Sequence, residues 1–280
     1  MKKILITGKN SYVGTSLKKW LSKYPKSYLI DMISLKDNSW REENFSKYDV
    51  IYHVAGIAHI KETKENAQLY YKINRDLAYE TAKKAKKEGV KQFIFLSSMS
   101  VFGIENGIID EDTVLNPKTN YGKSKLQAEK LITSLHDDKF NVAILRPPMI
   151  YGKGCKGNYK KLANFVVKIP FFPKIENIRS MIFIDNLSEF VRYVIDNNCS
   201  GIYCPQNKEY VNTSKMVELI AKYNGKKIWL TKIFNPLIVI FSKNETINKI
   251  FGDLVYEKSF SEIEGINYIP LEDSIRLTER

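Results

Sequence analysis

Long apolar runs are missing from this sequence, and their absence limits where the protein can reside. At the N-terminus only Ile4 to Ile6 are consecutively apolar before a threonine and a glycine, which is too short for the core of a signal peptide. The longest other apolar run, residues 236–241, is far below the roughly 20 residues that span a bilayer. We therefore expect neither a secretory leader nor an integral membrane segment.

Cysteine is also scarce, with three residues in the 280-residue chain: Cys155, Cys199 and Cys204. Their number is odd and their spacing is not that of a metal site, so the pattern argues against a disulfide framework and predicts no bound metal. A chain of this kind suits a reducing compartment. We expect a cytoplasmic protein.

Repeats and low-complexity tracts are absent, and apolar residues at 44% and aromatic residues at 12% can form a packed core, which excludes wholesale disorder. The net charge of +13 is compatible with binding nucleic acid, an anionic membrane or a small polyanion. The lysines, however, are spread over polar helix faces such as residues 81–89, TAKKAKKEG. We interpret the charge as a solvated surface that also steers a diphosphate substrate, and we expect no nucleic-acid partner.

Apolar runs of strand length alternate with helical patterns through the first half of the chain. Strands are expected at 2–8, 28–35, 49–56, 91–98 and 140–148, and helices at 13–21, at 70–87 and from Tyr121 onward. Nearly continuous apolar strands separated by helices are typical of a parallel sheet covered on both faces. The sequence therefore predicts an α/β fold with a doubly wound parallel sheet of the Rossmann type.

The pattern changes after Tyr151, where a Gly/Lys loop and a proline-punctuated stretch precede another strand and helix at 179–195. We expect a dinucleotide-binding domain over residues 1–153, to which residues of about 181–204 return. A smaller α/β substrate-binding region is expected over 154–280. In a doubly wound fold ligands bind at the carboxyl ends of the strands, so the second part is expected to cover the site.

A glycine-containing loop, GKNSYVG, joins the first expected strand to the first expected helix. Backbone N–H groups and the helix N-terminus can hold a pyrophosphate in such a turn. The middle position is Ser11, where glycine is usual, but serine is small enough to let a phosphate approach. The predicted cofactor contacts in this loop are Gly8, Asn10, Ser11, Tyr12, Val13 and Gly14.

The end of the second expected strand bears on the choice of cofactor. Asp31 lies inside the strand, whereas Ser34 and Lys36 lie at its exit. A hydroxyl and an ammonium at the exit suit a 2′-phosphate, and we therefore predict a preference for NADP(H). If Asp31 binds the ribose hydroxyls instead, NAD(H) is favoured.

Tyr121 and Lys125 are four residues apart and would share one face of a helix. An ammonium beside a phenol favours the phenolate, so we expect Lys125 to bring the pKa of Tyr121 down from about 10 toward the working range. Ser98, at the end of the preceding apolar run, can bind the substrate oxygen whose proton Tyr121 handles.

An ordered set of motifs, TGKNSYVG, HVAG, Asn74, SSMSVFG, YGKSK and RPPMIYG, resembles the extended short-chain dehydrogenase/reductases that act on nucleotide sugars, the NAD-dependent epimerase/dehydratase family. The resemblance covers essentially the whole chain. It implies that Ser98 and Tyr121 flank the reacting carbon and that Lys125 bonds the nicotinamide ribose. It also implies that Asn74 braces its helix and strand.

The same resemblance implies further contacts and a partner. It assigns Ala55, Gly56, Ala58, Pro147 and Met149 to the cofactor. Substrate contacts are implied for Ser100 and Met149 beside the catalytic pair, for Asn158 in the loop GKGCKGN, and for Arg179 on the diphosphate. A homodimer is implied through the helices that bear Asn74 and Tyr121.

Two family chemistries are excluded by the residues present. Sugar 4,6-dehydratases resemble this chain but carry an Asp-Glu pair where it has Met99 and Ser100. Epimerase-reductases that invert C3 and C5 place a cysteine near Ser100 and a histidine in the substrate domain. The histidines here are His53, His59 and His136, all in the first half. We interpret His53 as a strand residue and His136 as a surface residue at a helix end, and His59 is the one that would approach the substrate.

Two chemistries remain, a 4-ketoreductase and a 4-epimerase with bound NAD, and both need only Ser98, Tyr121 and Lys125. Met149 stands where UDP-galactose 4-epimerases typically have an asparagine. The rest of the sequence, including IFGDLVYE, looks most similar to capsule and O-antigen 4-ketoreductases. Those enzymes reduce a UDP-2-acetamido-2,6-dideoxy-4-hexulose to UDP-N-acetyl-quinovosamine or UDP-N-acetyl-fucosamine. We favour the reductase over the UDP-hexose or UDP-N-acetylhexosamine 4-epimerase. A non-catalytic binding protein on this fold is the third hypothesis.

Overall fold

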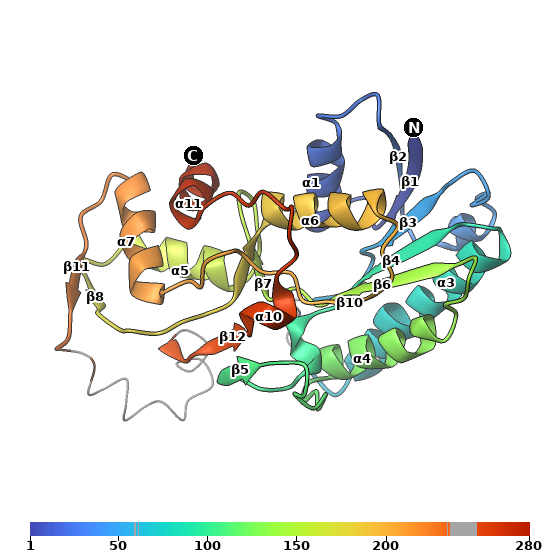
Figure 1. Cartoon of the computed structure of the whole chain (residues 1–280). Helices are drawn as coiled ribbons and strands as arrows, with labels where there is room; N and C mark the ends of the chain where they lie inside the picture. Colours follow the sequence, from blue (N-terminus) through green and yellow to red (C-terminus); the bar gives the residue numbers. More distant parts are fainter. Residues whose placement is uncertain (59, 61, 234, 236–250) are drawn as a thin grey trace. The chain divides into compact units, whose positions relative to one another are not determined.

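The computed structural model describes the chain except for residues 59, 61, 234 and 236–250, so the apolar run at 236–241 lies outside the described residues (Figure 1). The chain forms two compact units. Unit 1 comprises residues 1–103, 114–147 and 187–205, and unit 2 comprises residues 104–113, 148–186 and 206–280. The functional roles predicted for the two parts of the chain stay predictions.

Unit 1 is built on a six-stranded sheet in the order β10-β6-β4-β3-β1-β2, and its strand pairs are parallel. The strands are β1 (Lys2–Thr7), β2 (Tyr28–Ile33), β3 (Val50–His53), β4 (Gln92–Leu96), β6 (Asn141–Leu145) and β10 (Gly201–Tyr203). The chain goes from β1 outward to β2 and then crosses to β3 on the other side of β1. The predicted parallel α/β sheet is confirmed, and doubly wound folds bind ligands at such a reversal.

Helices cover both faces of this sheet (Figure 1). On one face lie α1 (Tyr12–Leu21) and α6 (Ile184–Asp196), and on the other lie α3 (Leu77–Lys87) and α4 (Asn120–Thr133). Two short 3₁₀ turns, η1 (Asn38–Arg41) and η3 (Met99–Val101), follow β2 and β4. The sheet is therefore a middle layer between two layers of helices.

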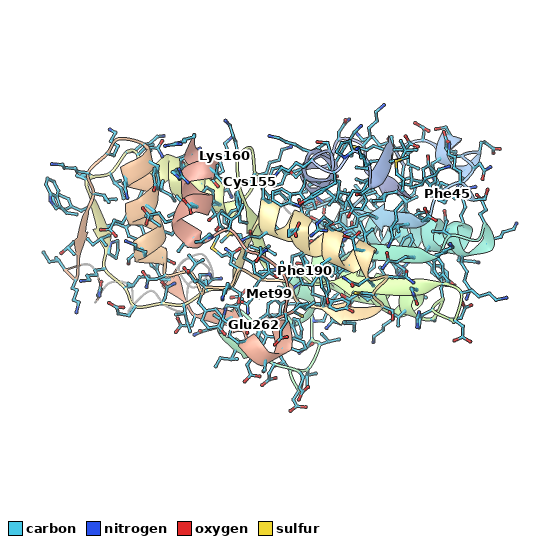
Figure 2. All side chains as sticks on the ribbon, turned by 45° about the horizontal axis from the view of Figure 1, so that its top comes forward. Phe45, Met99, Cys155, Lys160, Phe190 and Glu262 are labelled. Atoms are coloured by element: carbon cyan, nitrogen blue, oxygen red, sulfur yellow. The ribbon has the colours of Figure 1, made fainter. Side chains whose placement is uncertain are left out.

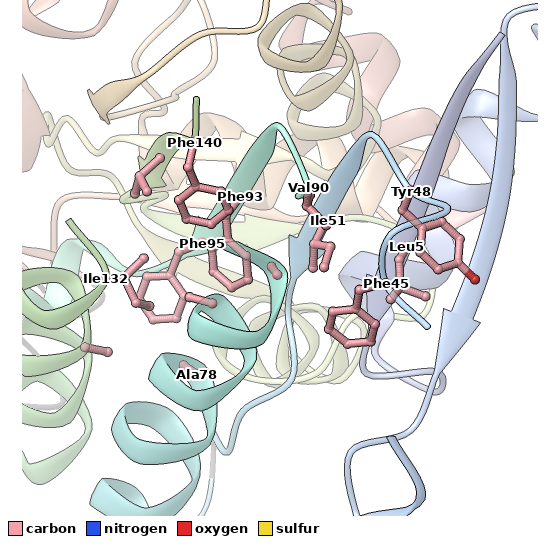
Figure 3. Packing of buried hydrophobic residues seen from close by; sticks show 14 of the residues in the cluster. Leu5, Phe45, Tyr48, Ile51, Ala78, Val90, Phe93, Phe95, Ile132 and Phe140 are labelled. Carbon is pink, nitrogen blue, oxygen red and sulfur yellow. The ribbon is translucent and has the colours of Figure 1, made fainter. Parts of the chain in front are cut away.

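An apolar cluster lies between the sheet and the helices α3 and α4 (Figure 3). Phe93 and Phe95, two residues apart on β4, project to the same face, as strand periodicity requires. Helix α3 meets them with Ala78, Ala82 and Ala85, whose i, i+4, i+7 spacing makes one small-residue stripe. Large rings on the sheet and small side chains on the helix allow close packing.

The helix predicted over residues 70–87 is interrupted. The structure has α2 (Ala67–Tyr70), then a π-helical turn η2 (Tyr71–Asp76), and then α3. Asn74 lies within the π-helical turn and is buried. Such turns are rare and occur frequently at functional sites, and periodicity alone does not indicate one.

Unit 2 contains three parallel two-stranded pairs instead of one wide sheet. They are β5 (Gly107–Ile109) with β12 (Leu254–Tyr256), β7 (Met149–Tyr151) with β9 (Met181–Phe183), and β8 (Phe171–Pro173) with β11 (Trp229–Thr231). Its helices are α5 (Asn158–Val166), α7 (Thr213–Tyr223), α10 (Lys258–Ser261) and α11 (Leu271–Glu279). The mixture of short strands and helices predicted after Gly201 is found in the described part of this unit.

All three cysteines are free thiols, and Cys155 is buried in unit 2 (Figure 2). Within the described residues, no helix has both the length and the apolar character needed to cross a bilayer.

Candidate functional site

The carboxyl ends of four neighbouring strands meet at one edge of the unit 1 sheet. Thr7 of β1 pairs with His53 of β3, and His53 pairs in turn with Phe95 of β4. Leu96 of β4 pairs with Leu145 of β6. The segments that leave these strands, 8–14, 54–58, 97–100 and 146–147, therefore start side by side. The register of the sheet gathers groups that are far apart in the sequence.

The loop from Gly8 to Gly14 packs tightly against the segment after β3. Gly8 has φ of +90°, and a Cβ there would lie 3.2 Å from the Cα of Ala55, so glycine suits both the backbone conformation and the close approach. Ser11 caps α1 by accepting a hydrogen bond from the N–H of Gly14 at 3.0 Å. A Cβ on Gly14 would lie 2.6 Å from that hydroxyl oxygen. Ser11 therefore supports the turn at the position where glycine is usual.

The helix that follows this loop has no acidic residue in its first turn. Tyr12 and Val13 are its first two residues, and Asn10 is exposed just before its cap. A helix N-terminus carries a partial positive charge and favours a phosphate group. The loop is thus suited to a pyrophosphate.

Asn74 clamps the segment after β3 through two hydrogen bonds to one residue. Its Oδ1 accepts from the N–H of Ile57 at 2.8 Å, and its Nδ2 donates to the Ile57 carbonyl at 3.1 Å. The same Nδ2 lies 3.2 Å from Ser124 Oγ on α4. A Cβ on Gly56 would lie 2.9 Å from Asn74 Oδ1 and 3.6 Å from Lys125 Nζ. Because only a glycine avoids this contact, Gly56 allows the segment to cross close to both side chains.

Ser98 and Tyr121 are brought close together, and the Ser98 side chain acts to lower the pKa of Tyr121. Ser98 follows β4, where its Oγ also accepts from the N–H of Ser100 at 3.2 Å and donates to the Ser100 hydroxyl at 3.1 Å. Tyr121 lies in the first turn of α4, and Tyr70 packs edge-on against it with ring centroids 6.5 Å apart. The predicted catalytic serine and tyrosine thus lie in contact.

The expected lowering of the Tyr121 pKa is not found, because its net shift is upward. Burial raises the pKa of Tyr121, the hydrogen bond from Ser98 lowers it, and Tyr70 raises it. The Lys125 ammonium instead donates to the Leu96 carbonyl at 2.7 Å and lies 4.6 Å from the centre of the Phe95 ring. Since burial is the largest cause and raises the pKa above its ordinary value, the phenol keeps its proton at neutral pH.

Lys125 itself is 5% exposed, and burial lowers its pKa to about 8, while the nearby Glu129 carboxylate raises it. The ammonium is therefore still mostly protonated at pH 7. It lies close to Gly56 as well, so it stands between the end of β4 and the segment after β3. This is a suitable place for a cation that binds a cofactor hydroxyl.

Behind Lys125 lies a buried cluster that the sequence pattern did not single out. Glu129, one turn further along α4, pairs with Arg146 at 2.7 Å, and both side chains are at most 6% exposed. The Glu129 carboxylate also accepts a hydrogen bond from the Ser97 hydroxyl. The cluster therefore fastens α4 to the ends of β4 and β6. The sequence signal that could have indicated this cluster is Glu129 itself, a carboxylate eight residues after Tyr121 on the same side of the expected helix.

The segment 97–100 is joined to the end of β6 as well. The N–H of Met99 donates to the Pro147 carbonyl at 2.9 Å. Pro147 is buried, whereas Ala58 on the segment after β3 is exposed. Pro147 follows β6 and Ala58 follows β3, two strands of the unit 1 sheet that are separated by β4.

The exit of β2 contains the residues expected to select the cofactor. Asp31 lies inside β2 and accepts a hydrogen bond from the Tyr48 hydroxyl at 2.8 Å. Ser34 and Lys36 follow the strand, and Ser34 Oγ accepts from the N–H of Lys36 at 3.2 Å. Lys36 is exposed. Asp31 is therefore partly engaged by a neighbour, and the exit presents a hydroxyl and an ammonium.

The other predicted substrate contacts lie in unit 2. Met149 is the first residue of β7 and pairs with Met181. Asn158 was expected in a loop but is the first residue of α5, because Gly157 before it takes a φ of +94° and ends the loop. The Arg179 guanidinium donates to the Gly252 carbonyl at 2.6 Å, and burial lowers the pKa of Arg179. Their roles as substrate contacts stay predictions.

The histidines occupy the places expected of structural residues where the structure describes them. His53 ends β3, is fully buried, and has Nδ1 3.1 Å from the Thr7 hydroxyl. His136 is exposed just after α4. His59 lies outside the described residues, so its approach to a substrate stays a prediction.

A doubly wound parallel sheet, a glycine loop opening a helix, and a serine, tyrosine and lysine at the strand ends define a dinucleotide-binding α/β protein of the Rossmann type. The residues present fit a nicotinamide dinucleotide: the N-terminus of α1 after the glycine loop suits a pyrophosphate, and the buried Lys125 ammonium beside Gly56 suits a cofactor hydroxyl.

The chain belongs to the NAD dependent epimerase/dehydratase family, whose model matches residues 4–203. The match covers the first five strands of the sheet, the glycine loop, Ser98, Tyr121 and Lys125, and it reaches the end of β10. The description of this family names NAD as the cofactor and epimerases and dehydratases as its members.

Two curated relatives are 4-epimerases. The chain is 30% identical to the UDP-glucose 4-epimerase of Vibrio cholerae, over 93% of this chain and 89% of that protein. It is 26% identical to the N-acetyl-alpha-D-glucosaminyl-diphospho-ditrans,octacis-undecaprenol 4-epimerase of Escherichia coli O157:H7, over 80% of this chain and 73% of that protein.

Solved structures share the fold. UDP-glucuronic acid 4-epimerase from Bacillus cereus, in complex with NAD, aligns with a TM-score of 0.76 and 18% identity over 99% of this chain and 97% of that one. The dTDP-4-dehydrorhamnose reductase from Bacillus anthracis, in complex with NADP, aligns with a TM-score of 0.74 and 19% identity over 99% of this chain and 98% of that one. One architecture thus accommodates both chemistries.

Proposed function

We propose that the protein reduces the C4 ketone of a UDP-2-acetamido-2,6-dideoxy-4-hexulose with NAD(P)H, forming UDP-N-acetyl-quinovosamine or UDP-N-acetyl-fucosamine. The observation that carries this proposal is that Ser98 and Tyr121 lie close together after β4 and at the start of α4, with the Lys125 ammonium bound to the carbonyl at the end of β4. These groups can bind a carbonyl oxygen and deliver a proton to it.

Each residue has a defined task in this reaction. A bound nicotinamide dinucleotide supplies the hydride that reaches C4. Tyr121 donates its phenolic proton to the C4 oxygen as that oxygen gains charge, and Ser98 hydrogen-bonds the same oxygen. Lys125 stabilises the phenolate that remains, and it binds the ribose of the cofactor. Tyr121 then regains a proton from solvent before the next turnover.

Two observations favour reduction. Burial raises the pKa of Tyr121, so the tyrosine begins the reaction as a proton donor, which is the form that ketone reduction requires. Ser34 and the exposed Lys36 follow β2, and a hydroxyl and an ammonium at this exit would suit the 2′-phosphate of NADPH. A cofactor that is exchanged at every turnover suits a reductase.

The second candidate is a UDP-hexose or UDP-N-acetylhexosamine 4-epimerase with tightly bound NAD. It is supported by the two curated relatives, which are both named as 4-epimerases. In this reaction Tyr121 removes the C4 hydroxyl proton during oxidation and returns it after the ketone has turned over. The same three residues serve both candidates, so substrate and cofactor must distinguish them.

Two parallel incubations test the choice. One contains UDP-4-keto-6-deoxy-N-acetylglucosamine and NADPH, or NADH in its place, and the other contains UDP-N-acetylglucosamine without added reductant. For the reductase we expect loss of absorbance at the nicotinamide band in the first and no change in the second. A new hexosamine in the second, together with NAD released on denaturation, would select the epimerase. Turnover in neither incubation would refute both assignments.

A further inference from the structure

Glu62 lies after β3 and contacts the beginning of the catalytic helix α4. One carboxylate oxygen, Oε1, accepts a hydrogen bond from the N–H of Tyr121 at 3.0 Å. The other, Oε2, accepts from the N–H of Asn120 at 3.0 Å and from its side-chain amide at 3.2 Å. One carboxylate from another part of unit 1 thus holds the first two N–H groups of the helix.

The helix also has a cap of its own, which reaches different groups. Thr119 accepts from the N–H of Gly122 through its hydroxyl at 3.1 Å and from the N–H of Lys123 through its carbonyl at 2.9 Å. The first four N–H groups of a helix have no partners within it. In α4 Thr119 serves the third and fourth, and Glu62 serves the first and second. A negative charge at this end also complements the helix dipole.

The segment that contains Glu62 is fastened at two more points. Asn74 holds Ile57, as described above, and the Tyr70 hydroxyl donates to the Ile60 carbonyl at 2.8 Å. Tyr70 is also the residue whose ring packs edge-on against Tyr121. The segment that crosses Gly56 is therefore joined to the backbone of Tyr121 by Glu62 and to its ring by Tyr70.

We propose that Glu62 is a positioning residue for Tyr121. It fixes the Tyr121 backbone relative to the segment after β3, so that the phenol reaches Ser98 and the substrate oxygen at the required distance. This inference rests on the proposed role of Tyr121 as the proton donor. It assigns no contact between Glu62 and the substrate. Its basis is that small displacements of a reacting group are costly, since about 1 Å can reduce the rate by about 100-fold.

The chain offers a matched control at the same helix end. Glu62→Ala and Thr119→Ala each remove one of the two caps, so both are expected to lower the free energy of unfolding to a similar extent. Only Glu62→Ala releases the N–H of Tyr121 itself. We expect kcat to fall about 10-fold or more in Glu62→Ala and about 2-fold or less in Thr119→Ala, with the dissociation constant of the dinucleotide unchanged in both.

Glu62→Gln tests the positioning role of Glu62 without the cavity that Glu62→Ala leaves. A glutamine oxygen can accept from one of the two N–H groups, so we expect a kcat between those of the wild type and Glu62→Ala. Amide hydrogen exchange supplies a readout that is independent of turnover. Exchange at residues 120 and 121 should accelerate in Glu62→Ala, and exchange at residue 122 should accelerate in Thr119→Ala, which keeps the backbone carbonyl that binds the N–H of Lys123.

Two results would overturn the inference: equal kcat values for Glu62→Ala and Thr119→Ala at equal stability, or unchanged exchange at residues 120 and 121 in Glu62→Ala. A Tyr121→Phe variant in the same assay separates this failure from a failure of the proposed function. If Tyr121→Phe is inactive and Glu62→Ala and Thr119→Ala have equal kcat values, only the proposed role of Glu62 is refuted. If Tyr121→Phe retains full turnover, the proposed function and the role of Glu62 are both refuted.

Discussion

The two units bury different kinds of polar side chain. Among the described residues, the buried lysine, glutamate, arginine and histidine side chains belong to unit 1, and they are Lys125, Glu129, Arg146 and His53. The buried polar side chains of unit 2 are neutral, and examples are Asn207, Ser274 and Gln206. Burying a charge costs far more than burying a hydroxyl or an amide that is hydrogen-bonded. Unit 1 accepts that cost beside the strand ends where the proposed chemistry occurs.

The difference also shows how each unit is held together. In unit 1 a wide sheet fixes the strand ends, and the buried Glu129–Arg146 pair fastens α4 to them. In unit 2 short strand pairs are linked by neutral hydrogen bonds, such as those of the Tyr151 hydroxyl with Ser274 at 2.6 Å and with Asn207 at 3.0 Å. Changes in the buried charges should therefore affect catalysis and stability together. Changes in the unit 2 networks should affect stability alone.

The largest expected effect is that of Tyr121→Phe. Removal of the phenolic proton should lower kcat by about 10²- to 10⁴-fold, the usual contribution of a general acid. Dinucleotide binding should be retained, because Lys125 and the glycine loop are untouched. Steady-state kinetics and cofactor titration measure the two quantities. A rate near that of the wild type would contradict the assignment of Tyr121.

Glu129→Gln is expected to have the next largest effect, on stability. It leaves Arg146 as a buried cation without its ion-pair partner, and breaking a buried pair in this way costs about 3–5 kcal/mol in free energy of unfolding. Urea denaturation measures the change. The matched control is Lys222→Met in unit 2, which breaks an exposed pair with Glu272 and should leave the denaturation midpoint nearly unchanged. Equal effects of the two variants would remove the distinction drawn between the units.

Tyr151→Phe examines the neutral network of unit 2. Loss of the hydroxyl leaves the buried Ser274 and Asn207 with unmet hydrogen bonds, which should cost about 1–3 kcal/mol in free energy of unfolding. We expect dinucleotide affinity to stay the same, since the network lies within unit 2. A weakened cofactor affinity at unchanged stability would contradict the expectation that the unit 2 networks affect stability alone.

His53 is expected to make the free energy of unfolding depend on pH. Burial lowers its pKa from 6.5 to about 3 in the folded protein, so the unfolded chain binds the proton more readily. The stability that the neutral imidazole provides is present above pH 6.5 and is lost as the pH falls toward 3. Between pH 7 and pH 5 the loss is about 2 kcal/mol.

Denaturation series at several pH values measure this slope. The slope should flatten in His53→Gln and remain in His136→Gln, which alters an exposed residue after α4. If His53→Gln kept the wild-type slope between pH 7 and pH 5, the loss would have another source.

Much of the site was predictable because its signals are local. The alternation of apolar runs and helical patterns predicted the parallel sheet. The glycine loop predicted the turn into α1, and the four-residue spacing of Tyr121 and Lys125 predicted their common helix. Ser98 at the end of an apolar run predicted a hydroxyl at the end of β4, where the structure places it. Each of these depends on residues that are neighbours in the chain.

The sequence by itself thus determined the fold class and the positions of Ser98, Tyr121 and Lys125 on their elements, because periodicity and spacing act over a few residues. Only the tertiary structure decided the direction of the Tyr121 pKa, the pairing of Glu129 with Arg146 and the contact of Glu62 with α4. These features depend on burial and on contacts between distant segments. Desolvation and long-range packing are properties of the folded chain, and no local pattern records them.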